Sequence, residues 1–338
     1  MKDGKFLTMA FESSCDETAV AVLADGRQVL SNVISSQIDI FKNYGGVVPE
    51  IAARHHLENI NEVMDRALRE AGVTLKEIDL IGVTHGPGLV GALLIGIATA
   101  KAVAYAADIP LIGVHHIMGH ISANFIQFPR LQPPFTALVT SGGHTNIADM
   151  QSYTCCKVIG STRDDAVGEA YDKVARVLGL GYPGGPKIDK IAREGDPQAI
   201  HFKRIMLEKD SYDFSFSGLK TAVLNYINSA KQSGREINRA DVAAGFQQAV
   251  VDVIVEKAMA AAREMNYGKL ALAGGVAANS KLRAELEKAC RKENIELYVP
   301  EPVLCTDNAA MIGCAAYYRY MAGERDGLDM DAYASLPL

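Results

Sequence analysis

The chain has 338 residues, of which 49% are hydrophobic and 22% are charged, a balance typical of globular proteins with a large core. The net charge of −6 excludes a uniformly basic surface, so a nucleic-acid partner would need a local basic patch or a helper protein. The six cysteines contain no Cys-x-x-Cys pair, which argues against a zinc ribbon and fits a reducing, cytoplasmic location. The N-terminal residues lack the apolar run of a signal peptide. The most apolar window, residues 89–107, is interrupted by Lys101 and predicts a buried helix rather than a membrane span.

The first half of the chain alternates strand-like and helix-like segments. Strands are expected at residues 5–12, 18–23, 28–35, 79–84 and 111–114, and helices at residues 49–72 and 89–107. The turn His85-Gly86-Pro87-Gly88 separates the fourth strand from the second helix. The last of these strands leads directly to three histidines.

The second half repeats this order of segments. Strands are expected at residues 135–140, 146–150, 155–161, 269–273 and 296–299, and helices at residues 164–178, 240–266, 279–292 and 307–321, with an insertion at 195–239. The pattern predicts a duplicated α/β unit with one sheet in each half and helices on both faces. Glycine-rich turns at strand ends are expected to face a cleft between the halves, where α/β sheets tend to bind ligands.

The histidines offer a metal site. His116 and His120 lie four residues apart, so in a helix both imidazoles share one face and can bind one metal ion. Such a pair alone is a common accident, and His115 is expected to pack or to hydrogen-bond in place. Asp307 is expected to cap the last helix. Asp307 is also expected to be the third metal ligand, because two histidines and a carboxylate suit iron or zinc. A metal ion bound by these three residues would then join the two halves.

Three glycine-containing or polar turns suit a nucleotide. Residues 139–145 carry two adjacent glycines, whose backbone N–H groups can cradle phosphate oxygens, and the polar hairpin at residues 12–18 occupies the matching place in the first half. Gly274-Gly275 would let an adenine or ribose pack on the backbone, although a plain strand-to-helix turn fits equally well. Asp172 and Asp189 flank a turn between helices and could accept ribose hydroxyls. They could equally be helix caps or surface charges.

In combination, these motifs resemble the bacterial TsaD (Gcp, YgjD) family over essentially the whole chain. One departure is Ser13-Ser14, which stands where Thr-Ser is frequent in the family. The resemblance rests on residues 12–18, 45–50, 86–89, 115–120, 141–145, 182–186, 214–220, 274–279 and 305–308.

The resemblance implies a duplicated actin/Hsp70/sugar-kinase-like (ASKHA) α/β fold, with two subdomains around a nucleotide cleft. We expect subdomains at residues 1–115 and 116–338, a helical insertion at 195–239 and a last helix near 308–325 that can pack with the first subdomain. The implied activity transfers the threonylcarbamoyl group from threonylcarbamoyl-AMP to N6 of adenosine 37 in tRNAs that read codons beginning with A, releasing AMP.

The resemblance also assigns roles to residues. It implies one divalent metal ion, Fe²⁺ with Zn²⁺ as the alternative, on His116, His120 and Asp307. The residues expected to bind threonylcarbamoyl-AMP, ATP or AMP are Val139, Thr140, Ser141, Gly142, Gly143, Asp172, Gly185, Asp189 and Asn279. For the implied reaction, Asp16 and Glu17 are candidates to take the proton from the attacking amine.

The family resemblance implies protein partners as well as tRNA. It names TsaB-like and TsaE-like proteins, a TsaC-type enzyme that supplies the adenylate, a cytoplasmic location and no membrane. Basic residues that could contact tRNA phosphates follow two expected helices, but solvated helix faces look the same. The two groups are Lys281, Arg283, Lys288, Arg291 and Lys292, and Lys187, Lys190 and Arg193.

Three functions other than that of a transferase share some of these sequence features. A small-molecule or sugar kinase would use the same glycine turns but gives no reason for the His116/His120 pair. A metalloprotease is excluded because Ile117 stands where a zincin needs glutamate, and Gly119 weakens the helix. A non-catalytic adenine-nucleotide-binding scaffold would have the same sequence features and stays open at this point.

Overall fold

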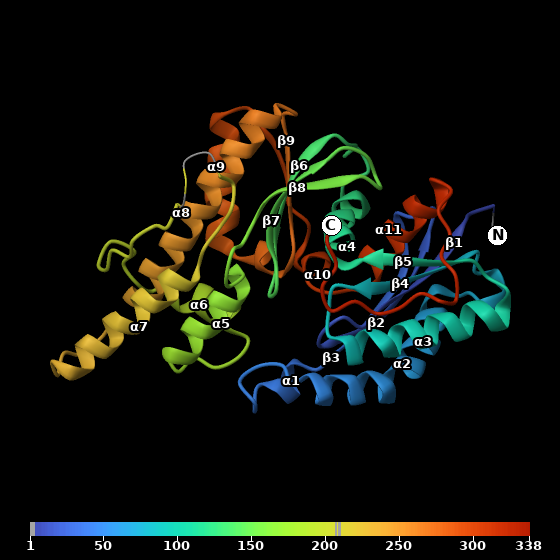
Figure 1. Ribbon diagram of the computed structural model, residues 1–338, viewed down its shortest axis with the longest axis horizontal. Helices are drawn as coiled ribbons and strands as arrows, with labels where there is room; N and C mark the ends of the chain where they lie inside the picture. Colours follow the sequence, from blue (N-terminus) through green and yellow to red (C-terminus); the bar gives the residue numbers. More distant parts are fainter. Residues whose placement is uncertain (1–3, 207, 209–210) are drawn as a thin grey trace. The chain divides into compact units, whose positions relative to one another are not determined.

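The structure, a computed structural model, describes residues 4–206, 208 and 211–338 (Figure 1). Contacts within the chain divide it into two compact units. Unit 1 comprises Met1–Pro133, Met150–Cys156 and Pro300–Leu338, and unit 2 comprises Pro134–Asp149 and Lys157–Val299. Each unit contains one five-stranded sheet.

The sheet of unit 1 has the strand order β3-β2-β1-β4-β5. Strand β1 pairs antiparallel with β2 and parallel with β4, and β4 pairs parallel with β5. Every residue of the central strand β1 is buried, as expected when helices cover both faces of a sheet. The bounds of the strands are Leu7–Glu12 for β1, Glu17–Ala24 for β2, Gln28–Ser36 for β3, Leu80–Gly86 for β4 and Leu111–His115 for β5.

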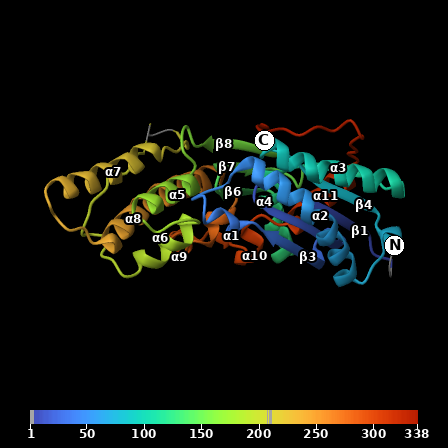
Figure 2. The same cartoon turned by 90° about the horizontal axis from the view of Figure 1, so that it is seen from below.

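Helices cover both faces of this sheet. The long helices α2 and α3 pack against each other and on strands β1 to β4, and Figures 1 and 2 show them side by side. Helix α11 packs on β1, β2, β4 and β5 and also against α4. Its small residues permit close approach, since a Cβ on Gly82 of β4 would lie 2.7 Å from the Cβ of Ala316. The helices of unit 1 are α1 (Ile38–Phe41), α2 (Pro49–Ala71), η1 (Leu75–Glu77), α3 (Val90–Ala107), α4 (His116–Gln127), α10 (Pro302–Cys305) and α11 (Ala309–Met321).

Unit 2 repeats the arrangement. Its sheet has the order β8-β7-β6-β9-β10, in which three strands that are consecutive in the chain are followed by two parallel ones. Helix α8 packs on β6, α9 packs on β10, and α6 packs on α8. The elements are β6 (Phe135–Thr140), β7 (Thr145–Met150), β8 (Cys156–Ser161), α5 (Val167–Val177), α6 (Gly184–Ala192), α7 (Ser217–Gln232), α8 (Arg239–Met265), β9 (Lys269–Ala273), η2 (Gly275–Ala278), α9 (Ser280–Lys292) and β10 (Glu296–Tyr298).

The duplicated α/β pattern expected from the sequence is confirmed by the two equivalent sheets. The expected turn between two helices, flanked by Asp172 and Asp189, is confirmed, because α5 ends at Val177 and α6 begins at Gly184. The helix begins there because Asp172 accepts a hydrogen bond from the Gly184 N–H at 2.6 Å, which satisfies a free helix donor. The expected insertion at 195–239 contains α7, and its residues 207, 209 and 210 lie outside the described part.

Among the described residues, helix α3 alone is long and apolar enough to cross a membrane. A core helix of a soluble protein can have the same length and composition, so this property does not by itself indicate a membrane span. Leu93 and Ile97 of α3 are buried, and the helix packs on β1, β4 and β5. The opposite face of α3 carries exposed apolar side chains.

Candidate active site: a metal centre and a nucleotide cavity

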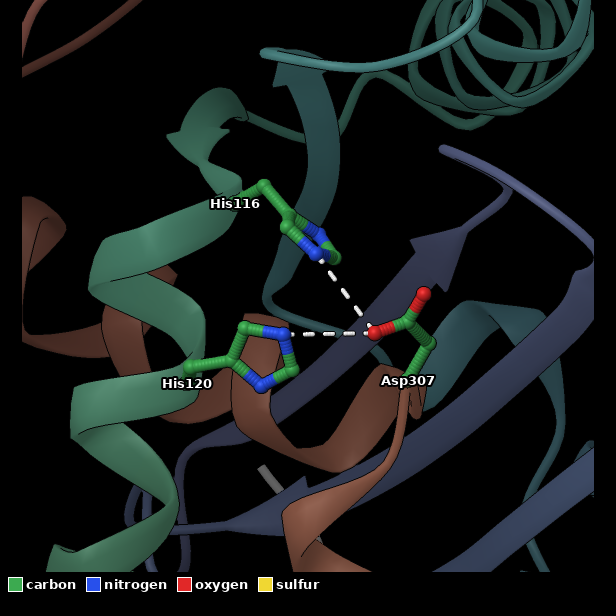
Figure 3. Close-up of side chains that lie close together, drawn as sticks. All are labelled: His116, His120 and Asp307. Atoms are coloured by element: carbon green, nitrogen blue, oxygen red, sulfur yellow. Dashed lines mark ion pairs between the residues drawn. The ribbon is translucent and has the colours of Figure 1, made fainter. Parts of the chain in front are cut away.

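Helix α4 presents His116 and His120 on one face, where both rings meet Asp307 (Figure 3). The Nε2 atom of His116 lies 3.5 Å, and that of His120 lies 3.2 Å, from Oδ1 of Asp307. The two ring centroids are 4.6 Å apart. Asp307 precedes α11, which packs against α4, and this contact explains how residues so distant in the sequence meet.

Two expectations about Asp307 need correction. The residue that caps α11 is Asn308, whose side chain accepts a hydrogen bond from the Met311 N–H at 3.0 Å. Asp307 is therefore not the cap, and its carboxylate turns to the histidines. The three residues also do not join two halves, because the chain returns to unit 1 at Pro300 and all three lie in that unit.

Behind His116 lies Glu12, a buried carboxylate at the end of β1 that the sequence analysis did not single out. Its Oε2 is 3.2 Å from Nδ1 of His116 and accepts a hydrogen bond from the Thr84 hydroxyl at 2.5 Å. Its Oε1 accepts from the Ser14 N–H at 2.5 Å. This pairing fixes the ring so that Nε2 points to Asp307, in the manner of carboxylate–histidine pairs around metals.

The centre is strongly coupled electrostatically. Burial opposes a charge on His116, but the Asp307 and Glu12 carboxylates raise the pKa of that ring to about 10. Burial would raise the pKa of Asp307, yet the two histidines hold that pKa well below its usual range. Burial lowers the pKa of His120. In the absence of a metal, the centre therefore holds one imidazolium between two carboxylates.

The donor set fits a divalent metal ion. One ligand atom from each of His116, His120 and Asp307 lies within 4.8 Å of the other two. Both ring nitrogens of His120 are buried. Within the described residues, Nε2 is paired with Oδ1 of Asp307 at 3.2 Å, and Nδ1 has no hydrogen bond. Two imidazole nitrogens and a carboxylate oxygen suit Fe²⁺ or Zn²⁺.

The polar hairpin before β2 carries the candidate catalytic acids. Asp16 is 7% exposed. Burial, together with Asp16 and Asp307, raises the pKa of Glu17 to about 10, so Glu17 is a neutral acid at pH 7. His56 of α2 holds this hairpin in place. Its Nδ1 lies 2.7 Å from the Thr18 hydroxyl, and its Nε2 lies 2.9 Å from the Cys15 carbonyl oxygen.

Unit 2 contains a cavity of about 380 Å³ that gathers five of the nine predicted nucleotide-binding residues. These five are Gly142, Asp172, Gly185, Asp189 and Asn279. The rest of the lining is Gly168, Tyr171, Pro183, Pro186, Arg193, Gly275, Val276 and Ala278. The sequence analysis assigned no role to Tyr171 or Val276, because apolar residues beside glycine turns carry no distinctive pattern.

The remaining four predicted residues do not line the cavity. Val139 and Thr140 are buried within β6. The Ser141 hydroxyl accepts a hydrogen bond from the His144 N–H at 3.1 Å, which closes the β6–β7 turn. Gly143 faces open space, because a Cβ atom at that position would have no other atom within 4 Å. These residues shape the turn that presents Gly142 to the cavity.

The cavity combines acceptors with exposed backbone. Asp189 accepts hydrogen bonds from the Ser280 hydroxyl and from Arg193, both at 2.8 Å. A Cβ on Gly142, Gly185 or Gly275 would meet nothing within 4 Å, so a flat ligand can lie directly on these glycines. Carboxylates beside such a surface can accept ribose hydroxyls. The arrangement therefore suits a nucleoside.

Comparisons with known proteins identify relatives of this chain. A relative from Clostridium botulinum, tRNA N6-adenosine threonylcarbamoyltransferase, is 58% identical over 98% of this chain and 97% of its own length. A Clostridium kluyveri protein of the same name is 57% identical over the same shares of the two chains. The solved structure of full-length HypF in its phosphate- and nucleotide-bound form is 14% identical, with a TM-score of 0.63 over 94% of this chain and 56% of HypF, and shows a shared fold.

The family model described as TsaD, tRNA N6-adenosine threonylcarbamoyltransferase, matches residues 28–314. That match spans strands and helices of both units, including His116, His120 and Asp307. Together with the identity to the clostridial relatives over nearly the full chain, it shows that the chain belongs to the TsaD family of tRNA N6-adenosine threonylcarbamoyltransferases, which form t⁶A in tRNA.

Proposed function

We propose that the cavity of unit 2 binds the adenosine part of threonylcarbamoyl-AMP. The observation that carries this proposal is the meeting of Asp172, Asp189 and Asn279 with three bare glycine backbones in one cavity. ATP and AMP share the adenosine and would bind there too. Replacing Asp189 by Asn removes a charged acceptor, and we expect AMP affinity to fall about tenfold.

Calorimetric titration with AMP measures this change. The matched control is Glu287→Gln, which makes the same chemical change on the exposed face of α9, outside the cavity. Equal AMP affinity in the Asp189→Asn variant and the control would show that the nucleoside binds elsewhere.

His116, His120 and Asp307 are proposed to hold one divalent ion, Fe²⁺ with Zn²⁺ as the alternative. The fit of the donor atoms and the burial of both His120 ring nitrogens support this assignment. When bound, such an ion supplies Lewis-acid stabilisation of developing negative charge. Glu12 orients the His116 ring, and Asp307 supplies the negative charge that holds the cation.

The transfer joins N6 of the adenosine to the carbamoyl carbon and breaks the bond between that carbon and the phosphate oxygen. AMP leaves with the electron pair of the broken bond, and N6 loses one proton. Asp16 and Glu17 are proposed to handle that proton. Because Glu17 is a neutral acid at pH 7, it is suited to donate a proton or hydrogen bond, and the role of acceptor falls to Asp16.

Quantifying t⁶A on unmodified tRNA, with threonylcarbamoyl-AMP supplied, tests the metal assignment. We expect His116→Ala and Asp307→Ala to lose bound metal and product together, while AMP binding in unit 2 persists. The control Lys231→Ala alters an exposed residue of α7 and should behave as the unchanged chain. Full product from a metal-free His116→Ala variant would refute the assignment.

Family membership decides against the kinase and scaffold alternatives for this chain. The tRNA substrate follows from the family's activity.

TsaB-like and TsaE-like partners, a TsaC-type supplier of the adenylate and a cytoplasmic location are proposed from the family resemblance. The structure supports a protein partner through one face of α3. Exposed apolar side chains follow this helix at a spacing of three or four residues, which is typical of a covered face. They are Val90, Leu94, Ala98, Ala102 and Tyr105.

Replacing both Leu94 and Tyr105 by Asp would place two charges on this face, so co-purification with the TsaB-like protein should fail. Val303→Asp, at an apolar residue that is exposed on α10, is the control. Normal co-purification of the double variant would show that the TsaB-like protein does not bind through α3.

A further inference from the structure

A second cavity, of about 370 Å³, lies in unit 2 beside the nucleotide cavity. It is formed by the C-terminal end of α6, the middle of α8 and the first turns of α9. Arg193 contributes to both cavities. The lining residues that carry chemistry are Arg193, Gln247, Gln248, Ser280 and Lys281.

Gln247 is the key residue because it is 5% exposed and still lines the cavity. Asn279 uses its own amide oxygen to accept from the Leu282 N–H, so it presents its NH₂ group to Gln247. Gln247 therefore turns its Oε1 to Asn279, at 2.9 Å. Its Nε2 then has two N–H donors with no acceptor among the residues that the structure describes. These N–H groups are open to the cavity that Gln247 lines, where a ligand can accept hydrogen bonds from them.

The rim of the cavity is cationic. The Arg193 side chain is 65% exposed, and only its Nη2 is engaged, by Asp189. Lys281 pairs with Glu285 at 3.1 Å and keeps further N–H donors. The nearby carboxylate of Asp189 is already held by Ser280 and Arg193. Donors from Gln247, Arg193 and Lys281 therefore surround one space.

Donors of this kind bind anions, and a guanidinium, an ammonium and an amide NH₂ together suit phosphate oxygens. We propose that this second cavity is a phosphate-binding subsite beside the adenosine cavity. Two sources share this chemistry: a phosphodiester of the tRNA backbone, and the phosphate of a second free nucleotide. The proposal rests on the proposed function, in which adenylate and tRNA must be held together.

The proposed subsite would also be linked to the first cavity through a hydrogen bond between side chains. Gln247 holds Asn279, and Asn279 lines the adenosine cavity and caps α9. A phosphate on the free NH₂ group of Gln247 would fix that amide in the orientation that keeps the hydrogen bond to Asn279. Binding at the second cavity is therefore expected to favour, and not to compete with, adenosine binding at the first.

The decisive variant is Gln247→Glu. It keeps an oxygen toward Asn279 and the same shape, but it replaces the two donors by a negative charge. Lys281→Glu reverses a charge at the rim and does not alter the first cavity. The control is Lys231→Glu, which makes the same charge change on an exposed part of α7 that lines neither cavity.

Binding is measured with two probes, AMP by calorimetry and an unmodified anticodon stem-loop RNA by fluorescence anisotropy. If tRNA is the source, Gln247→Glu and Lys281→Glu each weaken RNA binding at least fivefold relative to Lys231→Glu and make its salt dependence shallower. If a free nucleotide is the source, both variants remove a second, weaker AMP-binding event, and RNA affinity is unchanged.

The proposal is overturned if neither probe distinguishes the two variants from Lys231→Glu. Should Gln247→Glu fail to fold, Lys281→Glu at the rim gives the same decision. Failure of the proposed function is separate, because it would appear as a lack of t⁶A formation or of AMP binding in the unchanged chain, whatever the variants do.

Discussion

At the scale of single residues, Glu12 is the side chain that the metal centre depends on beyond its three ligands. We predict that Glu12→Gln lowers metal affinity about 10- to 100-fold, because the neutral amide no longer fixes the charge and orientation of His116. Competition with a chelator of known affinity measures this without reference to activity. Glu62→Gln, on the exposed face of α2, is the matched control, and equal affinities in the two variants would refute the role.

His56 carries a prediction about pH. Burial lowers the pKa of this ring below its ordinary value of 6.5, so the folded chain resists a proton that the unfolded chain accepts. The contribution of the neutral His56 ring to the free energy of unfolding is complete above about pH 6.5. It is lost as the pH falls below that value. A proton on Nδ1 would also remove the acceptor for the Thr18 hydroxyl.

The His56→Gln variant cannot titrate at this position. We expect the free energy of unfolding to fall less steeply between pH 7 and pH 5.5 in this variant than in the unchanged chain. Chemical denaturation at several pH values gives both slopes. A common slope for the two proteins would contradict the prediction.

The sequence revealed some of these residues and hid others for physical reasons. The spacing of His116 and His120 is local, so helical geometry alone predicts that the rings share a face. Glu12 and Thr84 meet only because β1 pairs parallel with β4, and no sequence pattern shows that contact. Asp307 was expected to cap α11, but the choice between Asp307 and Asn308 depends on backbone geometry at one residue.

At the scale of elements, the close contact between α5 and the β6–β7 turn shapes the nucleotide cavity. A Cβ on Gly168 of α5 would lie 2.6 Å from the backbone oxygen of Ser141 and 2.7 Å from the Cα of Gly142. Backbone atoms cannot rotate away, so Gly168→Ala must push the helix from the turn. We predict a loss of about 1–3 kcal/mol in the free energy of unfolding.

Gly142→Ala is the matched comparison, because a Cβ at that position would meet nothing within 4 Å. Its stability should be close to that of the unchanged chain, and denaturant melts of both variants provide the test. A Gly168→Ala protein as stable as Gly142→Ala would show that α5 can move away from the turn at no cost.

Elements with a clear period were predicted well, and those set by tertiary contacts were not. Helix α2 repeats apolar residues over six turns, so its sequence predicts it almost to the residue. Helix α6 begins with two glycines and a proline, which by themselves indicate a turn. It forms because Asp172 from α5 caps it, and that contact is visible only in the fold.

At the scale of the whole molecule, the proposed metal ligands and the proposed nucleotide cavity belong to different units. Metal at 100 times its dissociation constant should stabilise the folded chain by about 2.7 kcal/mol, since the ligands come together only in the folded state. Hydrogen exchange should show metal-dependent protection in α4 and at the start of α11, and AMP-dependent protection in α5, α6 and η2.

Removing the metal with a chelator should reverse only the first of these protection patterns. In the Asp307→Asn variant, added metal should leave exchange in α4 unchanged. Protection of α5 and α6 by metal alone would contradict the division of the ligands between the units.

The path of the chain between the units has a consequence for the gene. The chain passes from one unit to the other after Pro133, Asp149, Cys156 and Val299. Unit 1 is therefore encoded by three separate stretches of the gene and not by one continuous stretch. A stop codon after Val299 would leave every residue of unit 2 in place, yet it would strip unit 1 of α11 and Asp307. Nonsense and frameshift alleles near the 3′ end should therefore behave as loss of the metal centre.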